Sequence, residues 1–265
     1  MSKDKTIACT STLCRLTTLG FNKDEGAEDQ DPKTYNNKRK TILRKTMEDS
    51  QFYHLLMIKN HRQTTATMVQ VLCESYDAKK RVFNINNNTT IKFCVEEVAE
   101  LLGIPNTGSD PLLLCRFSKE KEVLKLPTSF PDYVYELKNK YADKLMSREK
   151  TSKSDAGKWG VNWERSKRHL STGSLVSILK KMEPNNTESR MQYRRLLSYY
   201  LVETFLLPST DEQFCRTSFY KCVEDLERFE ATNWAKATLD GIHEAASKIK
   251  NGLNTFRGCT PVLRH

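Results

Sequence analysis

Four groups of mainly apolar residues repeat with helical spacing between residues 175 and 249, and they constrain the fold more than any other feature. Side chains three and four residues apart lie on one face of a helix, so each group predicts a helix with a buried face. Burying one Leu or Phe fully contributes roughly 1.5–3 kcal/mol, so the four faces together predict a core. Their members are Leu175, Ile178, Leu179 and Met182; Tyr193, Leu196, Leu197, Tyr200, Leu201 and Phe205; Phe219, Cys222, Val223, Leu226 and Phe229; and Ala235, Thr238, Leu239, Ile242, Ala245 and Ile249.

Local signals set the ends of these helices. The second helix is predicted to end at Pro208, and residues 209–212 have the spacing of a capping box that begins the third. The last helix is predicted to start near Asn233 and to close at Asn251 and Gly252.

Shorter elements are predicted in the first half of the chain. Residues 65–77 have one apolar helical face, and residues 82–85 and 91–93 read as two strands joined by a turn of asparagines. Residues 95–102 predict a short helix, and residues 136–146 predict another through Leu137, Tyr141 and Leu145.

The helix at 95–102 carries its own start and stop signals. Gly103 is predicted to end it, and Pro105 prevents its continuation. Cys94 occupies the cap position, where sulfur is a poorer hydrogen-bond acceptor than the hydroxyl oxygen of Ser or Thr.

Two segments lack the apolar residues that a core requires. Residues 1–46 are expected to be a poorly ordered tail, and residues 147–173 a flexible basic insertion. The fold class predicted is therefore mainly α: a multi-helix globular domain over residues 47–262 with one small β-hairpin, a disordered N-terminal tail and a mobile basic insertion. A basic cluster in the tail fits either a nuclear-localisation signal or a solvated tail or helix start. Its residues are Lys38, Arg39, Lys40, Arg44 and Lys45.

Cysteine usage and charge narrow the classes of function. The eight cysteines include no Cys-x-x-Cys pair and no neighbouring histidine cluster, so no metal site is predicted. Neither a secretory signal nor a stretch approaching roughly 18 apolar residues is present. We therefore expect free thiols in a reducing compartment and no membrane insertion. The net charge of +10 permits an acidic partner without requiring one.

Several short motifs, taken in order, resemble the plant mobile domain. The matching blocks are residues 96–105, 205–210, 225–229, 233–237 and 258–259, and they extend over roughly residues 50–262. This family, also called the aminotransferase-like plant mobile domain, is similar to a domain found beside Ulp-type SUMO proteases in plant transposable elements. The residues that carry the motif are Gly103, Pro105, Pro208, Asp225, Asn233 and Trp234.

The resemblance implies a helical domain associated with mobile elements and with nuclear proteins that act in transposon silencing and genome maintenance. It implies no catalytic residues and no cofactor. Cys94 departs from the pattern, which usually has Thr at this cap. The chain also ends at His265, where relatives usually continue, so a truncated transposon remnant is one alternative.

Candidate catalytic residues lack the settings that their chemistry needs. A Ulp-type protease requires a His, an Asp and a nucleophilic Cys, but His54, His61, His169 and His243 lack the local signature. The aminotransferase label suggests a lysine that binds pyridoxal phosphate. Lys236 has the helical spacing of a solvated lysine, and no glycine-rich phosphate loop accompanies it. The sequence therefore predicts that the protein is not an enzyme.

Two further motifs favour structural roles over binding. Trp234 is predicted to anchor two helices in the core rather than to contact a partner. Residues 95–105 resemble the first helix of a helix-turn-helix, which would require a second helix directly after the turn. Gly108, Asp110 and Pro111 interrupt that position.

The basic insertion is the strongest candidate for binding. Between Glu136 and Met182 the chain has twelve Lys or Arg residues and five acidic residues, a net charge of +7. Aromatic rings among cations suit single-stranded nucleic acid, because bases stack on the rings. The alternative is a solvated loop whose charge keeps it soluble. The candidate nucleic-acid-binding residues are Lys150, Lys153, Lys158, Trp159, Trp163, Arg165, Lys167 and Arg168.

Three functions remain open from the sequence. The first is a non-catalytic, mobile-element-derived interaction domain in the nucleus, with the cytoplasm as the alternative location and an unknown protein as partner. The second is weak, sequence-independent nucleic-acid binding through the basic insertion. The third is a remnant without present activity. The sequence specifies neither the partner nor the oligomeric state.

Overall fold

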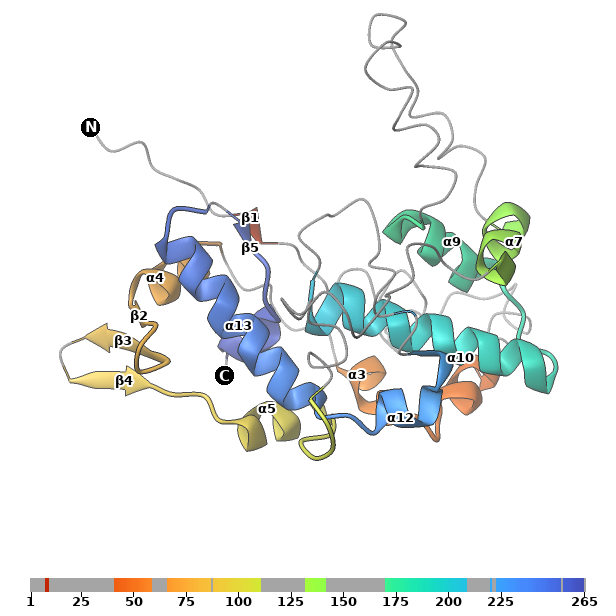
Figure 1. Cartoon of the computed structure of the whole chain (residues 1–265), viewed down its shortest axis with the longest axis horizontal. Helices are drawn as coiled ribbons and strands as arrows, with labels where there is room; N and C mark the ends of the chain where they lie inside the picture. Colours follow the sequence, from red (N-terminus) through yellow and green to blue (C-terminus); the bar gives the residue numbers. More distant parts are fainter. Residues whose placement is uncertain are drawn as a thin grey trace, which may run out of the picture.

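Helix α10 (Thr187–Leu201) runs through the middle of the computed structural model and continues directly into a π-helical turn at Val202–Leu206 (Figure 1). The structure describes residues 8–9, 41–58, 66–86, 88–110, 132–141, 170–208, 220, 223–253 and 255–264. Every residue from 196 to 207 is buried, which is more than one face of a helix. The predicted apolar face is confirmed, and other elements surround this segment on all sides.

Helix α13 (Trp234–Lys250) packs against α4 (Ala66–Glu74) and α5 (Val95–Leu102). All six residues predicted to face inward on α13 are buried, so this prediction is confirmed. Asn251 caps the C-terminal end, and Gly252 follows with φ +101°, a conformation that favours glycine. Helix α12 (Leu226–Glu230) precedes α13 and begins after Asp225, which caps it.

The third predicted helix is only partly within the described residues. The capping-box segment 209–212, Phe219 and Cys222 lie outside them. Val223, Leu226 and Phe229 are buried as predicted. They do not share one continuous helix, because Asp225 interrupts it and caps a new helix, α12 (Leu226–Glu230).

The small sheet has three antiparallel strands in the order β2-β3-β4. Strands β3 (Val82–Asn86) and β4 (Thr89–Ile91) form a hairpin as predicted, with a register shift between Asn84 and Asn86. The second strand, predicted at residues 91–93, lies two residues earlier. The additional strand, β2 (Tyr76–Asp77), was predicted as the end of a helix, but α4 ends at Glu74. The sequence pattern predicted Tyr76 to be buried on a helix, and it is buried in strand β2. Its apolar spacing therefore predicted burial but did not distinguish helix from strand.

Helix α5 begins and ends where the sequence indicated. Gly103 is left-handed at φ +60° and closes the helix, as predicted. Cys94 occupies the cap position, as predicted, and a capping box forms there: Cys94 Sγ accepts from the Glu97 amide, and the Glu97 carboxylate accepts from the Cys94 amide at 2.8 Å.

Ordered structure begins before the predicted boundary at residue 46. Residues 41–47 are helical, and Leu43 and Met47 are buried beside α3 (Tyr53–Met57). This helix has only two buried apolar residues, which are too few to form a recognisable helical pattern. They are buried through contacts with residues that are distant in the sequence. Strand β1 (Ala8–Cys9) pairs in parallel with β5 (Thr255–Phe256), which a one-turn 3-10 helix at Thr260–Arg264 follows.

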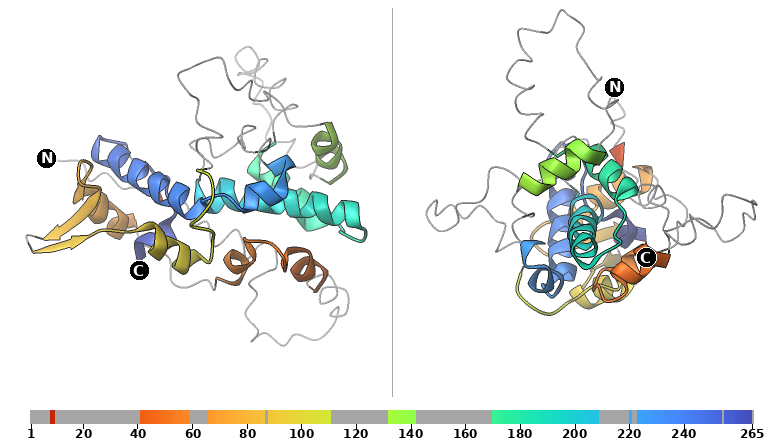
Figure 2. Two further views of the ribbon diagram at one scale, coloured as in Figure 1. Left: turned by 60° about the horizontal axis from the view of Figure 1, so that its bottom comes forward. Right: turned by 90° about the vertical axis from the view of Figure 1, so that its right-hand side faces the viewer.

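Helices α7 (Asp132–Tyr141) and α9 (Thr172–Lys181) pack against each other (Figure 2). The helix predicted at 136–146 therefore starts four residues earlier, and Leu145 lies outside the described residues. The insertion predicted to extend to residue 173 ends sooner, since Leu170 is buried and Ser171 caps α9. Leu175, Ile178, Leu179 and Met182 are buried as predicted. None of the helices described is long and apolar enough to span a lipid bilayer.

Candidate functional site around the start of helix α13

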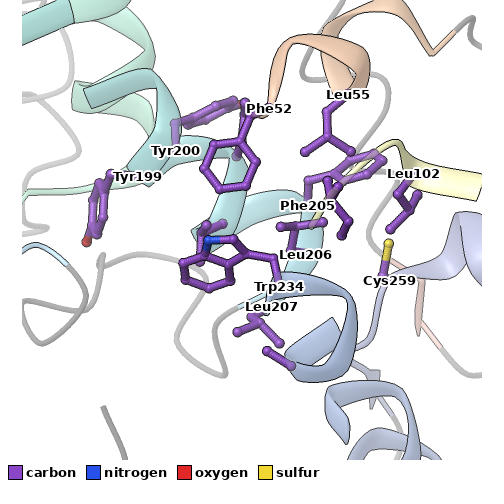
Figure 3. Packing of buried hydrophobic residues seen from close by; sticks show 14 of the residues in the cluster. Phe52, Leu55, Leu102, Tyr199, Tyr200, Phe205, Leu206, Leu207, Trp234 and Cys259 are labelled. Carbon is purple, nitrogen blue, oxygen red and sulfur yellow. The ribbon is translucent and has the colours of Figure 1, made fainter. Parts of the chain in front are cut away.

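Trp234, the first residue of α13, is fully buried at 0% exposure. Its indole Nε1 donates to the carbonyl oxygen of Phe229 at 2.6 Å, and its ring lies against Phe52 and Phe229 (Figure 3). The predicted role as a core anchor is confirmed. The indole joins α12, α13 and the segment before α3, so this motif residue is not an exposed partner contact.

The chain's own carbonyl groups close the start of α13. The Asn233 amide donates to Ser109 O at 2.9 Å, and the Ala235 amide donates to Pro105 O at 3.0 Å. Asn233 Oδ1 caps the amide of Lys236, while its Nδ2 donates to Asn106 O at 2.6 Å. Since these amides have partners, they are not available to bind the phosphate of a cofactor. The loop at residues 103–110 is instead fixed on the helix.

Two glycines allow this loop to fit. Gly108 has φ +94°, and a Cβ placed there would lie 2.2 Å from the carbonyl oxygen of Ala231. A Cβ at Gly103 would lie 2.5 Å from Cβ of His54. Between residues 103 and 110 the chain forms no second helix, as the interruption at Gly108 and Asp110 predicted. The loop covers α13 instead of forming a helix-turn-helix.

A chain of four charges lies along the first two turns of α13. Lys236 Nζ donates to Asp110 at 2.7 Å and to Asp240 at 2.8 Å, and Asp240 also pairs with Arg81. The Lys236 side chain is 44% exposed, in line with the predicted solvated lysine, and its two partners come from the loop and from the next turn. The hydrogen bonds that Lys236 Nζ donates to Asp110 and Asp240 raise the pKa of Lys236. A lysine held protonated in this way is not a nucleophilic amine.

His243 lies one turn further along α13 and is 6% exposed. Its ring stacks on Tyr76 and Phe83, and within the described part of the structure its Nδ1 has no hydrogen-bond partner. Burial, together with the nearby charge of Arg81 and against the opposing effect of Asp240, lowers the pKa of His243 to about 4. The imidazole is therefore neutral at physiological pH and packs as an aromatic ring.

Glu230, at the end of α12, accepts hydrogen bonds from two segments and is 2% exposed. Arg194 on α10 donates to both carboxylate oxygens, at 3.1 and 2.7 Å. Ser198 Oγ, Ser50 Oγ and the amide of Gln51 donate to the same carboxylate. Sequence patterns did not identify Glu230 as a functional residue. Its only sequence signal is its position next to the apolar Phe229.

Among the described residues, the thiols of Cys73, Cys94 and Cys259 form no disulfide bond. Burial raises the pKa of Cys259 to about 12, so its thiol is not ionised at neutral pH. Within the described ranges no three His, Cys, Asp or Glu side chains gather closely enough to hold a metal ion.

The predicted binding residues of the basic insertion all lie outside the described residues. These are Lys150, Lys153, Lys158, Trp159, Trp163, Arg165, Lys167 and Arg168. Lys38, Arg39 and Lys40 of the possible localisation signal lie outside them too. Arg44 and Lys45 are exposed on the helix at 41–47, on the side away from Leu43 and Met47. The structure therefore keeps these two basic residues accessible.

The remaining family-motif residues are parts of the same framework. Pro105 supplies a carbonyl to α13, Pro208 follows the π-helical turn, and Asp225 caps α12. Five of the six motif residues thus shape or close the elements that meet around α13, and Pro208 ends the segment at the centre of the molecule.

A family model described as a domain of unknown function (DUF8566) matches residues 37–264. This chain belongs to the DUF8566 family. The match starts just before the helix at 41–47 and ends with the 3-10 helix, so the DUF8566 domain includes every described element except β1. No curated protein and no solved structure matches the chain.

Proposed function

We propose that this DUF8566 domain is a non-catalytic interaction domain of mobile-element origin that binds a protein partner in the nucleus. The observation that carries the proposal is the use of motif residues as framework: Asn233 and Trp234 form fixed internal contacts. The resemblance to the plant mobile domain supplies the expectation of mobile-element origin and nuclear location.

The ionisable groups near α13 support the same proposal. Lys236 is held protonated between two carboxylates, His243 is buried and neutral, and the Cys259 thiol is buried. A catalytic base or nucleophile needs access to a substrate and a pKa matched to its role. These three side chains favour a structural role in the described part of the domain.

A pull-down of the full chain from nuclear extract tests this proposal. We expect protein partners that are retained after nuclease treatment. Trp234→Ala, which removes the core anchor, is the control that distinguishes capture by the folded domain from capture by unfolded chain. Partners that recognise the folded domain should not be captured by this variant. Capture only without nuclease would instead favour nucleic acid as the ligand, and no capture under either condition would favour an inactive remnant.

Nucleic-acid binding by the basic insertion is the second candidate. It rests on the net charge of +7 between residues 136 and 182. The basic insertion lies in sequence between helices α7 and α9, and these two helices pack against each other. The helices that flank the insertion are therefore close together in the structure.

Binding of a labelled single-stranded oligonucleotide at several salt concentrations tests the second candidate. If about four phosphates are contacted, log K should fall with log salt at a slope of about −3. Deleting residues 148–168 should abolish binding, whereas Trp159→Ala with Trp163→Ala should weaken it about tenfold without changing the slope. A slope near zero would contradict this candidate.

A further inference from the structure

The β3–β4 hairpin extends away from the helical body as a two-stranded ribbon (Figures 1 and 2). Val82 and Phe83 are buried where the ribbon leaves α13 and α4. Beyond them, all described residues from 84 to 92 are exposed. The outer part of the ribbon therefore presents both faces to solvent, unlike a strand that covers a core.

The two faces of the ribbon differ in chemistry. Asn84 is paired with Thr90, and Thr90 Oγ1 donates to Asn84 Oδ1 at 3.1 Å, so both side chains lie on one face. Lys92 belongs to the same face by strand alternation. The opposite face is apolar: Phe83 is paired with Ile91, and Phe83 also contacts Phe93. One face thus carries an amide, a hydroxyl and an ammonium group side by side.

The ribbon and its base are positively charged. Residues 78–95 contain Lys79, Lys80, Arg81 and Lys92 and no acidic residue. Arg81 is paired with Asp240, and the carboxylate of the preceding Asp77 accepts from the amides of Lys79 and Lys80. No ion pair joins the ammonium groups of Lys79, Lys80 and Lys92 to any acidic side chain of the described ranges.

We propose that the β3–β4 ribbon is a docking site for duplex DNA, with the ribbon in the major groove and the three lysines on the phosphates. Three exposed lysines that form no described ion pair complement the charge of the DNA backbone. The B-form major groove, about 12 Å wide, admits a two-stranded ribbon, and amide and hydroxyl groups hydrogen-bond to base edges there. The major groove of A-form RNA is too narrow for side chains to read, so the geometry favours DNA. This site is separate from the basic insertion and goes beyond the proposed function.

Fluorescence anisotropy with the full chain and a labelled 20-base-pair DNA duplex tests the proposal. The variant combines Lys79→Glu, Lys80→Glu and Lys92→Glu. Its matched control combines Arg44→Glu, Lys45→Glu and Arg228→Glu, which changes the net charge equally at exposed sites on other elements and outside the 136–182 segment. Circular dichroism should show both variants folded, because all six lysine or arginine side chains are exposed.

We expect the ribbon variant to bind the duplex at least tenfold more weakly than the control variant. The slope of log K against log salt should become shallower by about 2.7, because each phosphate contact contributes about 0.9. Double-stranded RNA of the same sequence should bind more weakly than the DNA. Equal losses in the two variants, equal affinity for RNA, or no duplex binding by the unmodified chain would each overturn the proposal.

Deleting residues 148–168 separates this site from the basic insertion. The difference between ribbon and control variants should persist in the deleted chain. If the deletion alone abolishes duplex binding and the ribbon variant has no effect, the ribbon proposal fails while nucleic-acid binding by the insertion stands. If the ribbon variant weakens duplex binding and the deletion has no effect, the ribbon proposal stands and nucleic-acid binding by the insertion fails.

Discussion

Buried polar side chains in this domain act through partners far away in the sequence. Glu230 receives hydrogen bonds from Ser50, Arg194 and Ser198, and Lys236 reaches Asp110. Local spacing identified Trp234 and Gly103 correctly, because a helix start and a left-handed cap depend on neighbouring residues. It could not identify these distant partners, since the pairing exists only after the chain has folded.

Glu230→Ala should destabilise the domain by about 3 kcal/mol, because the change leaves a partly buried guanidinium and two hydroxyl groups without their acceptor. Urea unfolding followed by circular dichroism measures this loss. Glu244→Ala is the control, since Glu244 forms an exposed pair with Lys248 on α13. That variant should lose less than about 1 kcal/mol, and equal losses would show that Glu230 is not a structural centre.

The buried imidazole of His243 should make stability depend on pH. Its pKa is about 4 in the folded state and about 6.5 in the unfolded chain, so the unfolded state binds more protons between these values. The contribution of His243 is therefore complete above about pH 6.5 and is lost as pH falls toward 4. His243→Phe retains an aromatic ring between Tyr76 and Phe83, and its stability should fall less between pH 6.5 and 4.5. Parallel stability curves for the two proteins would contradict this account.

At the scale of elements, the meeting of α13 with the loop at residues 103–110 organises the domain. The loop supplies carbonyl acceptors to the first amides of α13. The side chain of Asn233 accepts from the Lys236 amide within the helix and donates to Asn106 O in the loop. The motif residues around this contact were recognised from the sequence as a pattern. Their spatial meeting was not predictable, because about 125 residues separate the loop from the helix.

Gly108→Ala should destabilise the domain more than Gly252→Ala. Both glycines have positive φ, so either substitution carries backbone strain of roughly 1–2 kcal/mol. A Cβ at Gly108 would also collide with the carbonyl oxygen of Ala231, while at Gly252 it would meet open space. Thermal unfolding should show a clearly lower midpoint for Gly108→Ala. Similar midpoints would mean that the close approach of loop and helix is relieved at little cost.

Asn233→Ala should cost about 1–2 kcal/mol or more, because it removes the cap of α13 and the bond to Asn106 O. Asn233→Asp keeps the capping oxygen and loses only the donor. Its loss, measured by urea unfolding, should be smaller. An equal loss for both variants would assign the effect to the loop contact rather than to the cap.

For the whole molecule, the sequence predicted the helical class and the buried faces, because periodic apolar residues report burial directly. It misplaced the start of order and the second edge of the small sheet. Leu43 and Tyr76 become buried through contacts with other segments, and a short apolar group fits helix and strand equally well. The binding sites proposed from the sequence were chosen by their net charge. Net charge identifies a segment that can bind an acidic ligand but does not give its position in the fold.

The joining of early and late segments has a consequence for how this protein is synthesised. Phe52 packs on Trp234, and Ser50 binds Glu230, so these early groups are synthesised about 180 residues before their partners. Until α12 and α13 emerge, the nascent chain must keep those groups exposed, which is the condition under which polypeptides aggregate or bind chaperones. Stable folding of this domain is thus a late event in translation.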